Sequence, residues 1–217
     1  MNRIYKMDCL DGLRKIKSKS IRLIVADPPY FLGMTHNGHK GEFVDLAICK
    51  PFYSELFKEF KRVLTDDGSI FFFCDWRGYA FYYPIFDSFI GAKNLLIWDK
   101  TSAAGNFYSY NQELIIFHSH SKFNKGGSCI WSEKSFASGA KKTNGEKVHA
   151  TQKPIEIIER MILDTTQEND FVLDPFCGSG TSAFAAKKLN RNFIGFELND
   201  KYFDVIQERK NTLFIDI

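Results

Sequence analysis

Residues 171–197 read FVLDPFCGSGTSAFAAKKLNRNFIGFE, and this stretch decides the fold class. The apolar run FVL predicts a buried strand, and the segment DPFCGSGT after it predicts a tight turn. The next residues, SAFAAKKL, have a helical pattern, and FIGF predicts a second strand that ends at Glu197. A strand, a helix and a strand in succession indicate a β-α-β unit, the repeating element of a parallel sheet.

The turn in this unit suits a nucleoside cofactor. Gly178 and Gly180 allow the backbone to approach a ligand that side chains would block. The helix that follows offers free N–H groups to an anionic group. A carboxylate at Glu197, where the next strand ends, can accept hydrogen bonds from both hydroxyls of a ribose. A strand–turn–helix with purely structural glycines is the alternative, and the acid at the strand end favours the cofactor site.

The sequence of the same turn distinguishes between two candidate cofactors. An NAD site would carry Gly-x-Gly-x-x-Gly. Ala183 stands where the third glycine would fall, which that pattern tolerates, but Asp174-Pro175 precedes the turn and residue 177 is cysteine. S-adenosylmethionine has no pyrophosphate, and its methionine part carries an ammonium and a carboxylate. An aspartate at the strand end suits S-adenosylmethionine better than NAD.

A second motif follows an earlier strand. The apolar run at 21–26 stops at Asp27-Pro28-Pro29-Tyr30, because two prolines continue neither a strand ladder nor a helix. Ligands of open α/β sheets bind at such carboxyl ends. The Asp27 carboxylate and the Pro28 carbonyl can accept two hydrogen bonds from one exocyclic amino group, and Tyr30 offers a flat face for stacking. A surface turn is the structural alternative.

The rest of the chain alternates short apolar runs with helical patterns, as in an α/β protein with a mostly parallel sheet. Further strands are expected at 3–7, 69–74, 95–98 and 113–117, with a turn at 66–68. Further helices are expected at 10–16 and 77–90 and from residues 51, 154 and 200, with Pro51 in the first turn of its helix. We expect one domain over residues 1–217, with a mobile loop at 31–45 and a basic, target-reading insertion at 119–148.

Composition excludes several other classes. The chain has 217 residues, of which 44% are hydrophobic and 25% charged, and a net charge of +3, as in ordinary soluble globular proteins. No apolar run approaches the roughly 20 residues of a membrane span, and the N-terminus lacks the apolar segment of a signal peptide. The five cysteines form no Cys-x-x-Cys pair, so no disulfide framework or zinc site is expected. We expect a cytoplasmic protein with no metal and no membrane partner.

Together these motifs resemble the β-class amino-specific DNA methyltransferases, which act on adenine N6 or cytosine N4. The resemblance covers almost the whole chain, and the motif at 27–30 precedes the cofactor motif at 174–181, as in that class. The other matching segments are Met7-Asp8-Cys9, Trp98-Asp99-Lys100, Asn111-Gln112-Glu113 and His149-Ala150-Thr151-Gln152-Lys153-Pro154. The resemblance implies the S-adenosylmethionine-dependent methyltransferase fold, with a mostly parallel, doubly wound sheet, one antiparallel strand and a cyclically permuted motif order. The strand at 3–7 would then lie beside the C-terminal unit.

The resemblance also implies the site residues. The catalytic residues would be Asp27, Pro28, Pro29 and Tyr30. The methionine part of S-adenosylmethionine would be wrapped by Asp174, Phe176, Gly178, Ser179, Gly180 and Thr181. Glu197 would hold the ribose, and Asp8 and Cys9 would border the adenine. Thr151 and Lys153 would approach the methionine carboxylate.

The implied reaction transfers a methyl group from S-adenosylmethionine to adenine N6 in a specific double-stranded DNA sequence, with the base flipped out of the duplex. In the family, Asp at the first motif position goes mostly with adenine and Ser mostly with cytosine. Asp27 therefore favours adenine, and cytosine N4 is the closest alternative. A non-catalytic DNA-binding subunit with the same fold is the alternative from another class.

Two protein partners are also expected. Helix 77–90 has aromatic residues on more than one face, and they predict a symmetric homodimer. The residues concerned are Phe81, Tyr82, Tyr83 and Phe86. The family resemblance adds a cognate restriction enzyme as the second partner.

Overall fold

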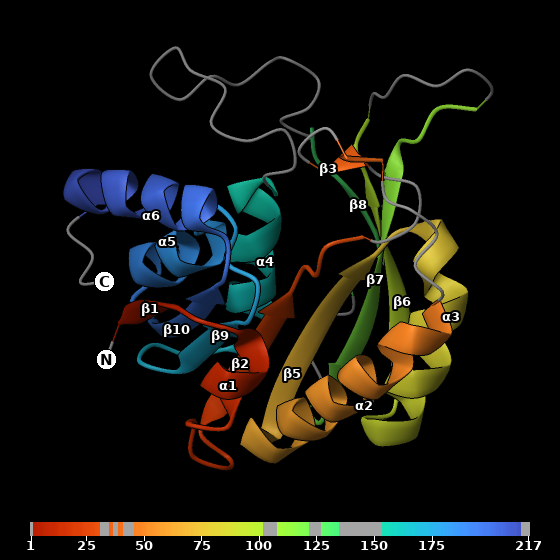
Figure 1. Ribbon diagram of the computed structural model, residues 1–217, viewed down its shortest axis with the longest axis horizontal. Helices are drawn as coiled ribbons and strands as arrows, with labels where there is room; N and C mark the ends of the chain where they lie inside the picture. The colour runs from red at the N-terminus through yellow and green to blue at the C-terminus, as the bar shows by residue number, and fades with distance from the viewer. Residues whose placement is uncertain are drawn as a thin grey trace.

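The computed structural model of the chain describes residues 2–30, 35–36, 39–40, 46–101, 108–121, 127–134 and 153–213. An eight-stranded sheet runs through the molecule in the order β1-β10-β9-β2-β5-β7-β6-β8. Helices cover both of its faces (Figure 1), which makes the sheet doubly wound. None of the helices in the described ranges is long and apolar enough to cross a membrane.

The elements follow the alternation expected from the apolar runs. The strands of the large sheet are β1 (Arg3–Lys6), β2 (Ile21–Ala26), β5 (Leu64–Cys74), β6 (Asn94–Asp99), β7 (Gln112–Ser119), β8 (Ile130–Ser132), β9 (Phe171–Asp174) and β10 (Asn192–Glu197). The helices are α1 (Cys9–Leu13), α2 (Leu46–Val63), α3 (Trp76–Phe89), α4 (Ile155–Thr165), α5 (Thr181–Lys188) and α6 (Asp200–Leu213). A separate two-stranded pair consists of β3 (Thr35–His36) and β4 (His39–Lys40).

Strand direction in the large sheet confirms the expected architecture. Strand β7 runs antiparallel to both of its neighbours, β5 and β6, while the other described pairings of this sheet are parallel. The first strand of the chain pairs with its last one, since Ile4 lies opposite Gly195. Figure 1 shows this as a red strand beside a blue one. The N-terminal strand therefore lies beside the C-terminal unit, as the permuted motif order implied.

Two hydrophobic cores, one on each face, hold the helices to the sheet. Strand β5 serves both, because successive side chains of a strand point to opposite faces. Phe71 and Phe73 pack with α4 and α5 in one core, whereas Phe72 and Cys74 pack with α1, α2 and α3 in the other. This double burial explains why the run SIFFFC is continuously apolar and does not alternate.

Several boundaries differ from the sequence expectation. Helix α2 begins at Leu46, so Pro51 lies inside the helix and not in its first turn. The missing N–H of Pro51 costs a hydrogen bond, and the buried face that begins at Tyr53 holds the helix regardless. The expected turn at 66–68 is an irregularity within β5, because Ile21 pairs with Leu64 and the next partners are Leu23 and Ser69.

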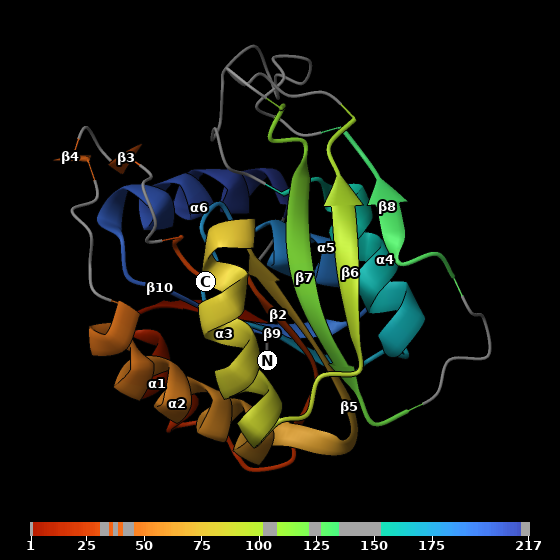
Figure 2. The ribbon, with the colours of Figure 1, turned by 90° about the vertical axis from the view of Figure 1, so that its right-hand side faces the viewer.

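Strand β8 was not expected. It lies inside the segment 119–148 and extends the sheet beyond β6 (Figure 2). Three residues with only Trp131 buried give too little apolar pattern to predict a strand. Residues 122–126 and 135–148 of this segment lie outside the described residues, as does most of the loop at 31–45. The target-reading insertion and the mobile loop therefore stay predictions.

Candidate functional site

The target-amine motif and the cofactor turn meet at one edge of the sheet. Strands β2 and β9 are parallel neighbours, with Ile24 opposite Leu173, so Asp27 and Asp174 lie where the two strands end. Strands β10 and β1 continue the same edge, which adds Glu197 and Asp8. Carboxyl ends of parallel strands are the usual ligand site of open α/β sheets. The two motifs predicted from separate parts of the sequence thus lie together at one edge of the sheet.

Glu197 ties the cofactor turn to the end of the neighbouring strand. Its Oε2 accepts the Gly178 N–H at 2.7 Å, and its Oε1 accepts the Asn199 N–H at 2.7 Å. The side chain is buried, and burial raises the pKa of Glu197, while the backbone donors oppose that shift. The carboxylate predicted to hold a ribose is therefore fixed in place by two backbone groups.

Asp174, the one carboxylic acid of the turn at 174–181, has a strongly raised pKa. Burial raises the pKa of Asp174 to about 7, although the Ser182 hydroxyl and the Phe176 N–H stabilise the carboxylate, and the charges of Asp27 and Glu197 add to the rise. The Phe176 N–H donates to Asp174 Oδ1 at 2.9 Å. A buried acid that is half protonated near neutrality favours a positively charged ligand, because a cation would stabilise its ionised form.

The backbone of the turn requires glycine at two positions. Gly178 has φ +53° and Gly180, the residue that caps α5, has φ +83°. Both values lie in the left-handed region that side chains disfavour. Ser179 and Thr181 are buried between and beyond them, with their hydroxyl oxygens 3.4 Å apart. The backbone at Gly178 faces open space, since a Cβ there would meet no atom within 4 Å.

The remaining cofactor residues lie as follows. Asp8 caps α1, and its carboxylate accepts the Leu10 N–H at 2.8 Å. Cys9 begins that helix and is buried, and burial raises the pKa of its thiol to about 12. Phe176 is half-buried against the core of α1, α2 and α3. Thr151 lies outside the described residues.

The target-amine motif is embedded in a cluster of charged and polar side chains, here called the Asp27 cluster, consisting of Asp27, Tyr30, Lys100, Glu113 and Lys153. The Lys153 Nζ lies 2.6 Å from Asp27 Oδ2 and 3.1 Å from Glu113 Oε2. The Tyr30 hydroxyl lies 3.0 Å from both Asp27 Oδ1 and Glu113 Oε2. Lys100 pairs with the other Glu113 oxygen, Oε1, at 2.7 Å. Within the motif itself Pro28 is buried and Pro29 is exposed.

Burial and charge act against each other in this cluster. Burial raises the pKa of Asp27, and Lys153 only partly offsets it. Burial also opposes ionisation of Glu113, but Lys153 and Lys100 together lower the pKa of Glu113. The two carboxylates outweigh the effect of burial on Lys153 and raise its pKa. Burial and both acids raise the pKa of Tyr30, so its hydroxyl remains a neutral donor.

These contacts show the surroundings of Lys153 and bring two further residues to the Asp27 cluster. In the described part of the chain the Lys153 ammonium pairs with Asp27 and Glu113, which supply the anions that a buried ammonium requires. The expected approach of Lys153 to the methionine carboxylate stays a prediction. Glu113 and Lys100 were matched only as family landmarks. Glu113 lies at the site because β7 is antiparallel and starts at the edge where the parallel strands end. Lys100 follows β6, which runs antiparallel to β7 and therefore ends at that edge.

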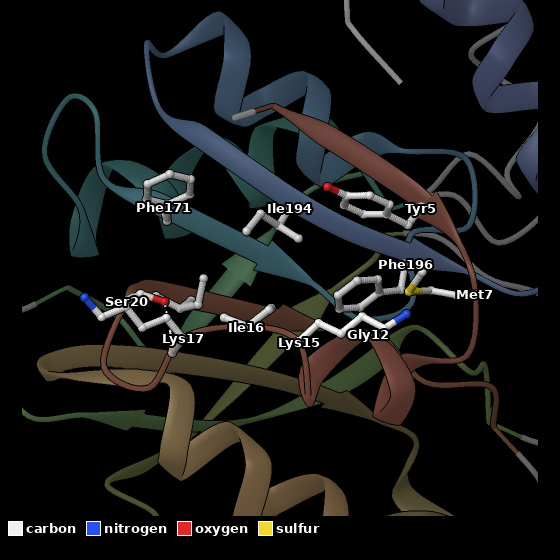
Figure 3. A pocket seen from close by; sticks show the side chains of 11 residues that line it. Tyr5, Met7, Gly12, Lys15, Ile16, Lys17, Ser20, Phe171, Ile194 and Phe196 are labelled. Atoms are coloured by element: carbon white, nitrogen blue, oxygen red, sulfur yellow. Dashed lines mark hydrogen bonds between the residues drawn. The ribbon is translucent and has the colours of Figure 1, made fainter.

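A separate cavity lies away from this edge. It has a volume of about 390 Å³ and opens on the face of the sheet that carries α1 (Figure 3). Much of its lining is apolar, from Tyr5, Met7, Ile16, Phe171, Ile194 and Phe196. None of the predicted site residues lines it, although Met7 and Phe196 are the chain neighbours of Asp8 and Glu197. Among the residues that the structure describes, no group of three or more His, Cys, Asp or Glu side chains could hold a metal ion.

Comparison with known sequences identifies the family. Residues 21–208 match the family described as DNA methylase. The chain is 33% identical over 245 residues to the Type II methyltransferase M.HinfI of Haemophilus influenzae, an alignment that covers 96% of this chain and 68% of that protein. The Type II methyltransferase M1.MboII of Moraxella bovis is 33% identical over 251 residues, covering 93% of this chain and 94% of the relative.

Solved structures share the fold. The M1.HpyAVI-SAM complex superposes with a TM-score of 0.71 at 24% identity, over 97% of this chain and 100% of that one. The cytosine-N4-specific PvuII DNA methyltransferase gives a TM-score of 0.74 at 17% identity, over 96% and 86% of the two chains. The sequence match spans the strands that carry both motifs, and the fold is that of these enzymes. The chain therefore belongs to the N6-adenine/N4-cytosine DNA methyltransferase family.

Proposed function

We propose that this chain transfers a methyl group from S-adenosylmethionine to the exocyclic N6 amino group of adenine in a specific double-stranded DNA sequence. The observation that carries the proposal is the common edge of β2 and β9, which brings Asp27 next to the turn that begins at Asp174. A methyl donor in the turn and an amine at Asp27 would be neighbours. Positioning of this kind supplies a large part of the rate of a two-substrate reaction.

The residues of the turn fit S-adenosylmethionine. Asp174 is a buried acid whose raised pKa favours a cationic ligand, and the open backbone at Gly178 leaves room for one. The M1.HpyAVI relative is a complex with this cofactor. We propose that Asp174, Phe176, Gly178, Ser179, Gly180 and Thr181 hold its methionine part, that Glu197 holds the ribose, and that Asp8 and Cys9 border the adenine, with Thr151 at the methionine carboxylate. When bound, the cofactor supplies a methyl group that its sulfonium already activates.

The target-amine motif is suited to an aromatic amine. The lone pair of such an amine is delocalised into the ring, which makes it a poor nucleophile. The Asp27 carboxylate and the Pro28 carbonyl would accept its two N–H groups, draw the nitrogen towards tetrahedral geometry and stabilise the positive charge that develops on it. The nitrogen gains the methyl group as the bond to sulfur breaks, and it then releases one proton towards Asp27.

The amine lies inside a duplex, so the base must be flipped out before it can reach Asp27. Flipping costs a few kcal/mol, which stacking on an aromatic ring and contacts with phosphates offset. Tyr30 is the aromatic residue of the motif, and its ring is half-buried. We propose that its ring supports the flipped base while its hydroxyl stays hydrogen-bonded within the Asp27 cluster.

Adenine is the proposed target because the motif begins with Asp27. The PvuII relative, which is cytosine-N4-specific, has the same fold, so the fold does not separate the two bases. Incubation of mixed-sequence duplex DNA with the protein and labelled S-adenosylmethionine, followed by digestion to nucleosides and mass spectrometry, tests the choice. We expect N6-methyladenine, and none with Asp27→Asn. N4-methylcytosine would reverse the base assignment, and unmodified DNA would refute the activity.

The assembly and location of the protein are part of the same proposal. We propose one domain, a cytoplasmic location, a cognate restriction enzyme and a homodimer that uses helix α3. Of the four rings named for the dimer, Tyr82 and Phe86 are buried in the core and Phe81 is half-buried. Tyr83 is 38% exposed and stacks on Tyr79. The dimer contact would therefore be centred on Tyr83.

A further inference from the structure

Both oxygens of the Asp27 carboxylate already have partners. Oδ1 accepts the Tyr30 hydroxyl at 3.0 Å, and Oδ2 accepts the Lys153 ammonium at 2.6 Å. An ammonium at this distance partly neutralises the oxygen that should accept a hydrogen bond from the target amine. It would also repel the positive charge that develops on the amine nitrogen. Asp27 therefore stabilises the developing charge better when this ammonium is held elsewhere.

Glu113 is a second acceptor for both of these donors. Its Oε2 lies 3.1 Å from the Lys153 Nζ and 3.0 Å from the Tyr30 hydroxyl oxygen. The hydroxyl carries a single proton, so it donates fully to only one of the two acids at a time. Lys153 has three N–H donors and a flexible stem. A small movement therefore transfers each donor from Asp27 to Glu113.

Glu113 is also well anchored for such a role. Lys100 pairs with Oε1 at 2.7 Å and leaves Oε2 to the other two donors. The side chain is 12% exposed, and its backbone is fixed in the sheet, where Glu113 lies opposite Trp98. Two acids and two lysines balance in this cluster. A transfer of Lys153 to Glu113 keeps that balance and leaves a free negative charge at Asp27.

We propose that Glu113 is a positioning residue of the methyl transfer, which takes the Lys153 ammonium and the Tyr30 hydroxyl from Asp27 when the target amine arrives. This inference rests on the proposed function. Glu113 touches neither the base nor the cofactor in this role. It acts through Lys153, and its substitution should therefore change turnover more than binding.

Glu113→Gln tests the role, because the amide keeps the shape of the side chain and removes its charge. Lys153 is then held by Asp27 alone. We expect kcat to fall roughly 10- to 100-fold, the rate equivalent of a charge-assisted hydrogen bond, with KM for DNA and for S-adenosylmethionine within about threefold of wild type. Glu113→Asp keeps the charge, and its kcat should lie between that of wild type and that of Glu113→Gln. Glu168→Gln, at an exposed acid between α4 and β9, is the matched control and should leave kcat unchanged.

The double variant Glu113→Gln/Lys153→Met separates this role from a merely structural one. If Glu113 acts by drawing the ammonium away, removal of the ammonium frees Asp27, and kcat should recover at least about fivefold over Glu113→Gln alone. Thermal melting and cofactor affinity of each variant show whether fold and binding are retained. Wild-type kcat in Glu113→Gln, or a double variant no faster than the single one, would overturn the inference. Wild-type protein that methylates no DNA would instead overturn the proposed function.

Discussion

Binding of S-adenosylmethionine should depend on pH through Asp174. The pKa of this acid is raised to about 7 in the free protein, and the ammonium of the cofactor favours its ionised form. With that pKa, roughly 90% of the molecules hold the proton at pH 6 and roughly 10% at pH 8. If the complex keeps Asp174 ionised, the affinity falls about tenfold between pH 8 and pH 6, or about 1.4 kcal/mol.

Asp174→Asn is the matched variant, because the amide keeps the size of the side chain and cannot ionise. The cofactor has an amino group that titrates in the same range, so the ratio of wild type to variant isolates the contribution of Asp174. Isothermal titration calorimetry at pH 6, 7 and 8 gives both dissociation constants. Wild type should also release about half a proton on binding at pH 7, which buffers of different ionisation enthalpy detect. Identical pH dependence in the two proteins would refute the reasoning.

The same acid should affect stability in the absence of cofactor. Its folded pKa of about 7 lies above the ordinary value of 3.8, so between these values the folded protein holds a proton that the unfolded chain has lost. The free energy of unfolding therefore falls as pH rises through this window, by up to roughly 4 kcal/mol. Urea unfolding of Asp174→Asn should show a smaller fall over the same range than wild type.

Three further perturbations have expected outcomes. Asp27→Ala should abolish turnover and also destabilise the fold by about 1–2 kcal/mol. The loss is smaller than for a fully buried pair, because Lys153 keeps Glu113 as a partner and Asp27 is 28% exposed. A urea midpoint equal to that of wild type would contradict the loss of stability. Glu197→Ala leaves the N–H groups of Gly178 and Asn199 without their acceptor, and calorimetry should show cofactor binding weakened by about 1–3 kcal/mol. Light scattering at micromolar concentration should give twice the 25.0 kDa of the chain, falling to one chain with Tyr83→Glu; fully active 25.0 kDa protein would show that the dimer is unnecessary.

Local sequence signals predicted the elements that frame the site. The strand, turn and helix around Gly178 and Gly180 were placed to within about one residue, because apolar runs and glycines act over a few positions. The start of α2 was predicted too late, because proline is typical of the first turn of a helix, whereas α2 begins at Leu46 and continues through Pro51. Strand β8 was missed because its pairing with β6 is non-local and its three residues carry little pattern.

The meeting of the two motifs could also be predicted, but the cluster around Asp27 could not. Asp27 and Asp174 each end a parallel strand, and a shared edge follows from topology alone. The cluster joins residues that are far apart in the chain, since Tyr30 and Glu113 are separated by 83 positions and Asp27 and Lys153 by 126. Side-chain pairing at such separations has no period or motif in the sequence. The pairing of the buried Lys153 ammonium with Asp27 and Glu113 was therefore not predicted.

Strand direction is the reason that Glu113 belongs to the site at all. Strand β7 has eight residues, and Glu113 is its second residue. At about 3.3 Å per residue, the strand spans roughly 25 Å. In a parallel orientation its start would lie at the opposite edge of the sheet, far from Asp27. The antiparallel strand β7 thus brings an acid to the edge where the parallel strands bring theirs, and this acid contacts the same two donors that contact Asp27.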